Sequence, residues 1–311
     1  MTLNLKTLFS FLESNPTEQD CIKYFEKLRW PDKVVSPHDP TSEVYSCSNP
    51  RYPYKCKNTG KYFNVKTRTI LRKSKISLKK WFLALHLFSS EEISSYQLAK
   101  KLGVQQRTAW FILHRLRESF KSPAFISEML KGSVEIDETF IGGKNKNRHW
   151  DKKIPNSQGR NCKDKIPALG MLERNGNLIA RIVPNTKWKT LEPIIKANIE
   201  AGSSIYSDEW YRNSNLSESY NHQLINHSAK QYVNGKVHTN SIESFWVIPK
   251  RAIAATYYQI SRKHAQKYMD EFTFRFNTRK YTTEERFNLA LASTVGKRLT
   301  YRELTNLSSP L

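Results

Sequence analysis

The chain has few acidic residues, few cysteines and no long apolar run, and each shortage excludes a class of protein. No apolar stretch approaches the roughly 20 residues of a membrane-spanning helix. The amino-terminal residues lack the basic, apolar and small-residue regions of a secretory signal. Four cysteines show no disulfide-like spacing, which is typical of a protein of the reducing cytoplasm. We therefore expect a cytoplasmic protein with no membrane partner.

The shortage of acids leaves a large positive charge. Lys and Arg total 51 against 28 Asp and Glu, a formal net charge of +23. An excess of this size indicates a polyanionic partner, with nucleic acid ahead of a membrane surface. The 311 residues suffice for about two domains, and 15 Phe, 15 Tyr and 7 Trp indicate a folded chain with an aromatic core. We expect a nucleoid-associated protein.

Residues 34–72 have the texture of a zinc ribbon but lack most of its cysteines. Short aromatic strands are broken there by Pro, Asn and Gly, while two Cys-x2-Cys knuckles would be needed to hold zinc. Only Cys56 occupies a knuckle position; Thr59 stands where its partner is expected, and the other knuckle reads Ser36-Pro-His-Asp39. An irregular site made of Cys56, Cys47, His38 and Asp39 remains an alternative. We predict a degenerate zinc-ribbon-like module without zinc.

The sequence pattern of residues 73–121 predicts helices that bind DNA. An amphipathic segment covers Ser74–Phe88, and a later helix ends at Gly103, followed by a three-residue turn and a second helix from about Gln105. This is helix-turn-helix spacing, in which the start of the second helix contacts base edges. The alternative is an ordinary helical hairpin whose charged residues face water. The residues predicted to contact DNA here are Gln105, Gln106, Arg107, Thr108 and Arg115.

Beyond Gly132 the pattern becomes α/β. A strand is expected over 133–141, a hairpin over 166–183, a helix over 187–201, a strand ending at Asp208, and helices towards the C-terminus. This order suits a mixed-sheet α/β layer fold. A basic loop containing Lys144 follows the first strand and is a further candidate DNA contact.

Three acids stand out in this region. Asp137 lies within a strand whose neighbours are apolar, where a carboxylate is costly to bury unless a metal or base meets it. Asp208 ends a later strand, a place where open sheets present active residues. Glu243 follows in a helix. Oxygen ligands of this kind prefer Mg²⁺ or Mn²⁺, and a pair of such ions activates an attacking oxygen and stabilises a leaving one. Glu135 and Glu138 are expected to point away from Asp137.

The stretch from Val237 to Arg251 joins an acid to a base. Glu243 precedes Lys250 by seven residues, close to two helical turns, so an unbroken helix would put both on one face. A metal-holding acid beside a phosphate-holding base suits phosphodiester chemistry; the alternative is a surface ion pair without function. Pro249 is expected to interrupt this helix.

Six segments together resemble bacterial insertion-sequence transposases of the DDE, ribonuclease H-like type, in the branch related to eukaryotic Merlin elements. The segments, which span nearly the whole chain, are Ser74–Trp81, the helix-turn-helix of Ile93–Arg117, Val134–Lys144, Tyr206–Glu209, His238–Arg251 and Phe272–Arg279.

The resemblance implies metal-dependent DNA cleavage and strand transfer at terminal inverted repeats. Asp137, Asp208 and Glu243 match the metal-binding triad for two divalent ions, Lys250 matches the basic residue after it, and Asn240 is the alternative third ligand. Arg251 is a further implied DNA contact. The implied partners are transposon ends and target DNA, bound by a homodimer or larger assembly. The alternative is an inactive or regulatory DNA-binding protein that retains the fold.

The expected divisions follow from these assignments. They are an N-terminal helical segment (1–33), the zinc-ribbon-like module (34–72), the helix-turn-helix region (73–121), a ribonuclease H-like transposase domain (132–295) and a tail (296–311).

Overall fold

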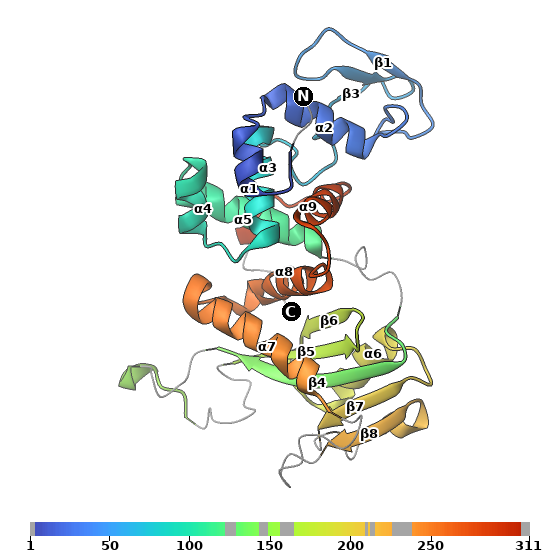
Figure 1. Cartoon of the computed structure of the whole chain (residues 1–311), viewed down its shortest axis with the longest axis vertical. Coiled ribbons are helices and arrows are strands. Elements are labelled where there is room, and N and C mark those ends of the chain that lie inside the picture. The colour runs from blue at the N-terminus through green and yellow to red at the C-terminus, as the bar shows by residue number, and fades with distance from the viewer. Residues whose placement is uncertain are drawn as a thin grey trace. The chain divides into compact units, whose positions relative to one another are not determined.

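The chain forms two compact units, each of which is described by itself. The computed structural model describes residues 4–121, 129–142, 149–155, 165–208, 211, 215–225 and 238–305 (Figure 1). The first unit comprises Met1–Lys121 with Lys280–Ser309, and the second comprises Ser122–Arg279. No helix within the described ranges has the length and apolar character needed to cross a membrane.

The first unit is mostly helical. Its helices are α1 (Leu8–Glu13), α2 (Glu18–Arg29), α3 (Leu78–Ser90), α4 (Ser95–Leu102), α5 (Gln106–Phe120), α9 (Thr283–Ala292) and α10 (Tyr301–Thr305). Thr17 caps α2 by accepting a hydrogen bond from the amide of Asp20, whose carboxylate accepts one in return. Glu18 then caps α3 from outside, because its carboxylate accepts from the amides of Leu78 and Lys79.

The helix α9 belongs to this first unit, which differs from the predicted domain boundary at residue 295. The ring of Phe287 on α9 meets that of Phe82 on α3 edge-on at 5.2 Å. The Tyr24 hydroxyl donates to Asn288 Oδ1 at 2.6 Å. Burial of these aromatic rings holds α9 against the N-terminal helices, which are distant in sequence. No local sequence pattern in α9 predicts this packing.

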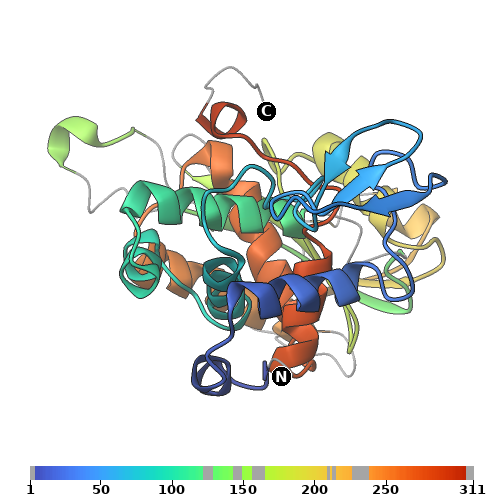
Figure 2. The ribbon, with the colours of Figure 1, turned by 90° about the horizontal axis from the view of Figure 1, so that it is seen from above.

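A small antiparallel sheet follows α2 at one end of this unit (Figure 2). Its strands, in order, are β1 (Val44–Ser46), β2 (Tyr54–Cys56) and β3 (Tyr62–Phe63). Trp30, at the end of α2, packs edge-on against the rings of Tyr54 and Phe63 at 5.8 and 6.0 Å. The sheet is therefore held to α2 by aromatic packing.

Hydroxyl groups surround Cys56 where a zinc ribbon would carry further cysteines. Burial alone would raise the pKa of the Cys56 thiol, but hydrogen bonds from Ser36, Ser42 and Thr59 outweigh it and lower the pKa to about 7. Ser36 Oγ also accepts from the amides of His38 and Asp39 at 3.1 and 3.3 Å. Hydrogen bonds thus stabilise the turn that begins at Ser36 and the turn between Cys56 and Thr59.

The helices α4 and α5 are joined by a three-residue turn. Ser94 caps α4, and the helix ends at Gly103, whose φ of 60° lies in the left-handed region that glycine adopts without strain. The next helix begins at Gln106, close to the predicted start. Leu98, Leu102 and Ala109 are buried between the two helices.

The second unit is built on a five-stranded mixed sheet. The strands are β4 (Ser133–Ile141), β5 (Ile166–Glu173), β6 (Leu178–Ile182), β7 (Ser204–Asp208) and β8 (Asn221–Ile225), in the spatial order β6-β5-β4-β7-β8. Strand β5 runs antiparallel to β4 and to β6, whereas β4, β7 and β8 are parallel neighbours. The mixed-sheet α/β prediction is confirmed.

Helices cover both faces of this sheet (Figure 1). They are α6 (Trp188–Asn198) on one face, and α7 (Asn240–Ala252) with α8 (Ala265–Asn277) on the other. Ile242 and Trp246 of α7 pack in one core with Phe272 of α8, while Leu191 and Ile195 of α6 pack in the other. Strand β4 is the central strand of the sheet.

Candidate active site

The alternation of side chains along β4 assigns its acids to two faces. Val134 and Ile136 lie in the core beneath α6, so Glu135 and Asp137 face α7. Glu138 points to the α6 side, as predicted, where its Oε1 accepts a hydrogen bond from the hydroxyl of Tyr211 at 2.8 Å. The prediction that Glu135 points away from Asp137 is wrong, because residues two apart in a strand share a face.

The register of the sheet brings Asp208 towards Asp137. Strand β4 pairs with β7 so that Val134 lies opposite Ile205 and Glu135 opposite Tyr206. Continuing that register by two residues on each strand sets Asp137 opposite Asp208, on neighbouring strands roughly 5 Å apart. Two acids 71 positions apart in sequence (208 − 137 = 71) therefore meet at one end of the sheet.

Helix α7 supplies the third acid from its first turn. The Thr239 hydroxyl, which is buried, donates to Glu243 Oε1 at 2.7 Å and orients that carboxylate. Asn240 is the first residue of the helix and is exposed.

The basic residues of α7 lie further along its exposed face. Lys250 and Arg251 are both exposed in the last turn of the helix. The expected interruption at Pro249 is wrong: α7 runs continuously from Asn240 to Ala252 with Pro249 buried inside it. Burial of the proline ring in the core offsets the backbone hydrogen bond that proline cannot donate.

The acids act on one another electrostatically. Burial, followed by the neighbouring charges of Glu138, Asp208 and Glu243, raises the pKa of the Asp137 carboxyl to about 7. Crowded carboxylates of this kind are expected where a divalent cation supplies the balancing charge. Among the described residues, no three His, Cys, Asp or Glu side chains are already close enough to form a ligand set. The donor chemistry fits Mg²⁺ or Mn²⁺, and the ligand atoms would have to close around the ion.

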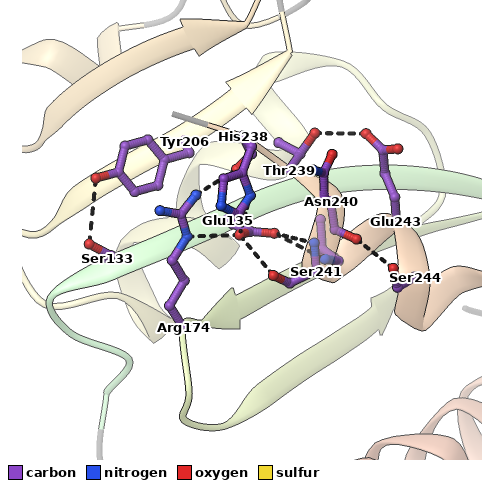
Figure 3. A network of polar contacts seen from close by, with 11 residues as sticks. Ser133, Glu135, Arg174, Tyr206, His238, Thr239, Asn240, Ser241, Glu243 and Ser244 are labelled. Carbon is purple, nitrogen blue, oxygen red and sulfur yellow. Dashed lines mark hydrogen bonds and ion pairs between the residues drawn. The ribbon is translucent and has the colours of Figure 1, made fainter. Parts of the chain in front are cut away.

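Glu135, which sequence reasoning did not identify, holds the start of α7 (Figure 3). Its side chain is fully buried, and its Oε2 accepts hydrogen bonds from the amides of Ser241 and Ile242, both at 3.0 Å. These are two of the amides that an α-helix leaves without an internal partner at its N-terminus. A residue of β4 thus caps the helix that carries Glu243, from a position two residues before Asp137.

Arg174 completes this arrangement from the end of β5. Its Nε donates to Glu135 Oε1 at 2.8 Å, and its Nη2 donates to the carbonyl oxygen of His238 at 2.8 Å. The guanidinium also lies over the ring of Tyr206, 4.3 Å from its centroid. Arg174 therefore connects β5, β7 and His238, two residues before α7, to Glu135 (Figure 3).

Gly170 lies opposite Asp137 in the β4–β5 register, and its lack of a side chain allows α7 to approach the sheet there. A Cβ atom at Gly170 would lie 2.6 Å from Trp246 Cζ2 and 2.8 Å from Ile242 Cδ1. We expect Gly170→Ala to destabilise the second unit by about 1–3 kcal/mol, as overpacking does, and to displace α7. Urea unfolding measures the first effect. Gly202→Ala is the control for this clash. Nothing lies within 4 Å of a Cβ atom at Gly202, but its φ of 83° disfavours alanine, so this variant measures backbone strain without a clash.

The predicted DNA contacts of the first unit divide into two groups. Gln105 and Arg107 are exposed at the start of α5, and Gln106 and Thr108 are half-buried. Gln106 Nε2 donates to Ser95 Oγ on α4 at 2.7 Å. Lys144 lies outside the described residues.

Arg115, the remaining predicted DNA contact on α5, is buried and does not face solvent with Gln105 and Arg107. Its side chain is 7% exposed, and its Nη2 donates to the carbonyl oxygen of Arg72 at 2.7 Å. Its guanidinium lies near the rings of Trp81 and Phe111. Arg115 stands on the inner side of α5, which its apolar neighbours Ile112 and Leu116 also occupy.

Comparison with known proteins places the second unit in a family. The ISXO2-like transposase domain matches residues 129–277. An uncharacterized protein in transposable element ISH50 of Halobacterium salinarum is 25% identical over 255 residues, covering 76% of this chain and 86% of that protein. An uncharacterized transposase-like protein of Haemophilus influenzae is 33% identical over 98 residues, covering 31% of this chain and 77% of that protein.

A solved structure, the crystal structure of the Mos1 strand transfer complex, matches 94% of this chain and 98% of its own chain, at 12% identity and a TM-score of 0.28. The sequence relatives define the class, that of transposases encoded by insertion sequences. The chain belongs to the ISXO2-like transposase family, of the DDE type.

Proposed function

We propose that the chain binds the terminal inverted repeats of an insertion sequence and cleaves and joins DNA in a ribonuclease H-like second unit. The observation that carries this proposal is the crowding of acids from three elements. Burial and the charge of Glu138, followed by the charges of Asp208 on β7 and Glu243 on α7, raise the pKa of Asp137 on β4. A carboxyl with a raised pKa beside acids from two other elements favours a catalytic site over a set of solvated surface acids.

In the proposed site, Asp137, Asp208 and Glu243 hold two Mg²⁺ or Mn²⁺ ions, with Asn240 as the alternative to Glu243. When bound, such ions supply Lewis-acid activation of the attacking oxygen and stabilise the leaving oxygen. The Thr239 hydroxyl fixes the orientation of the Glu243 carboxylate. Lys250 and Arg251, two turns further along the exposed face of α7, attract the phosphates of the DNA strand.

The chemistry consists of two balanced substitutions at phosphorus. Water attacks the phosphodiester at the end of the element, and the 3′ oxygen leaves as a hydroxyl. That hydroxyl then attacks a phosphodiester of the target, whose own 3′ oxygen leaves in turn. One phosphodiester is made for each target bond broken, so strand transfer requires no external energy source.

End recognition is assigned to α4 and α5, acting as a helix-turn-helix. Gln105, Gln106, Arg107 and Thr108 begin the second helix, where side chains of this motif contact base edges. Lys144 is proposed as a further phosphate contact. A homodimer or larger assembly would bring two transposon ends together.

The test is cleavage of duplex DNA that carries the terminal repeats of the element. We expect nicking at the repeat boundary with Mg²⁺ or Mn²⁺, and joining of the new 3′ end to a target plasmid. Glu243→Gln should abolish nicking, whereas Asn240→Ala should retain it; the reverse result would make Asn240 the third ligand. Gel electrophoresis of end-labelled DNA measures both steps.

Binding without nicking would contradict the proposed activity. A wild-type chain that binds the terminal repeats selectively, yet leaves them intact with either ion, would be the alternative DNA-binding protein. An exposed change in the first unit, Lys27→Ala on α2, serves as the control for nonspecific loss of activity.

A further inference from the structure

The first unit contains a basic pocket that the assignments above leave unused. It has a volume of about 350 Å³, and the residues that define it here are Arg72, Lys73, Arg115, Arg298, Thr300 and Tyr301. Backbone hydrogen bonds join its two walls: the Ile70 amide donates to the carbonyl oxygen of Thr294, and the Gly296 amide to that of Arg68, both at 2.9 Å. The pocket is therefore built from segments more than 200 residues apart.

Arg115 forms the buried end of this pocket, and no described carboxylate forms an ion pair with it. Its side chain is 7% exposed, and among the described residues no hydrogen-bond partner reaches its Nε. None of the described residues that line the pocket is acidic. Burial alone, with no carboxylate contributing, lowers the pKa of the Arg115 guanidinium to about 10. A buried charge in this condition is costly unless an anion meets it.

The exposed walls of the pocket add further donors. Arg72, Lys73 and Arg298 are exposed, and Thr300 and Tyr301 bring hydroxyl groups. Lys73 has a φ of 57°, a left-handed conformation that is uncommon outside glycine, so its backbone is held in place by its surroundings. A guanidinium presents donors in a planar fork that matches the oxygens of a phosphate.

We infer that this pocket binds a backbone phosphate of the DNA that the start of α5 contacts. The inference deepens the proposed function and rests on its DNA-binding part. Arg115 follows Arg107 by eight residues on α5, about 12 Å along the helix, which equals three or four base-pair steps of a duplex. A duplex engaged by the start of α5 thus carries phosphates at the distance of the pocket.

The first experiment measures the salt dependence of binding by the full chain, on a terminal-repeat duplex and on a scrambled duplex. Arg298→Ala and Lys73→Ala, both at exposed residues, should each weaken binding about tenfold and by the same factor on both duplexes. Each should also reduce the slope of log affinity against log salt by about 0.9. Lys27→Ala makes the same charge change away from the pocket and should leave the slope unaltered. Equal slopes for all variants would overturn the inference.

The second experiment tests the pocket without DNA. Inorganic phosphate should raise the unfolding temperature of the wild-type chain above that in chloride at matched ionic strength, and the increment should shrink in Arg298→Ala but persist in Lys27→Ala. Arg115→Lys, which keeps the charge but removes Nε, should lose the increment as well. An increment that is the same in every variant would contradict the pocket.

The two experiments separate the source of the phosphate. An increment that depends on Arg298, combined with an unchanged salt slope, would mean that the pocket takes a free anion and would overturn the DNA assignment. A wild-type chain that binds no duplex at any salt concentration would contradict the proposed function and the DNA source together, while the phosphate measurement would still report on the pocket.

Discussion

Asp137→Asn should remove cleavage and, in the absence of divalent ions, make the second unit more stable. The carboxyl has a pKa of about 7 in the fold, far above its ordinary value, because burial and three neighbouring acids disfavour its charge. At pH 8 the ionised group therefore destabilises the metal-free fold by on the order of a few kcal/mol, since one pKa unit corresponds to about 1.4 kcal/mol. The neutral amide relieves this repulsion.

The sign of the pH effect follows from the raised pKa. Below about pH 4 the carboxyl is protonated in the folded and the unfolded chain alike, and it costs nothing. As the pH rises from about 4 to 7 the unfolded chain loses this proton first, so the wild-type fold loses stability across that range. The variant should lack this component. Thermal unfolding in EDTA at a series of pH values measures the difference.

Addition of Mg²⁺ should reverse the order of stability. The ion balances the crowded charge in the wild-type chain, whereas the variant has lost one ligand and should gain less. Cleavage should fall by roughly a thousandfold or more, because Lewis-acid stabilisation at phosphorus is worth several kcal/mol. Asp32→Asn, at an exposed position of the first unit, should change neither quantity. A variant no more stable than wild type in EDTA would contradict the crowding of acids.

The sequence reveals the three acids but not the residues that hold them in place. Alternation along β4 identifies Asp137 as an acid on an otherwise apolar strand, and the same alternation puts Glu135 on its face. What the alternation does not reveal is the partner of Glu135. Arg174 and Ser241 lie 39 and 106 positions away, and only the pairing of β4 with β5 and the docking of α7 bring them together.

Arg115 and Pro249 show a second limit of prediction from sequence. The residue type suggests one role, and the packing of the side chain gives it another. An arginine in a DNA-binding helix suggests a groove contact, yet Arg115 lies on the apolar side of α5. A proline within a helix suggests a break, yet Pro249 is buried within α7. In both cases the position within the helical period, with apolar residues three or four places away, is the better guide.

Glu135→Ala should cause a large loss of stability of the second unit. It removes the acceptor from two helix-terminal amides and from Arg174, whose side chain is only 19% exposed. Breaking one partner out of a buried ion pair costs about 3–5 kcal/mol, because it leaves the remaining groups buried without partners. Urea unfolding of the second unit measures this cost. Glu192→Gln, in a more exposed pair with Lys196, should change stability by less than about 1 kcal/mol.

Glu135→Gln separates the positioning of α7 from folding. The amide keeps the size of the side chain and one acceptor oxygen, so the unit should remain folded while the first turn of α7 loosens. Hydrogen exchange at the amides of Ser241 and Ile242 should accelerate, and that of β5 should not. Cleavage should fall while affinity for terminal-repeat DNA is kept, because Glu243 belongs to the helical turn that Glu135 caps. If exchange in that turn were unchanged while cleavage fell, Glu135 would act on the reaction by some route other than the start of α7, and its hydrogen bonds to Ser241 and Ile242 would be structural alone.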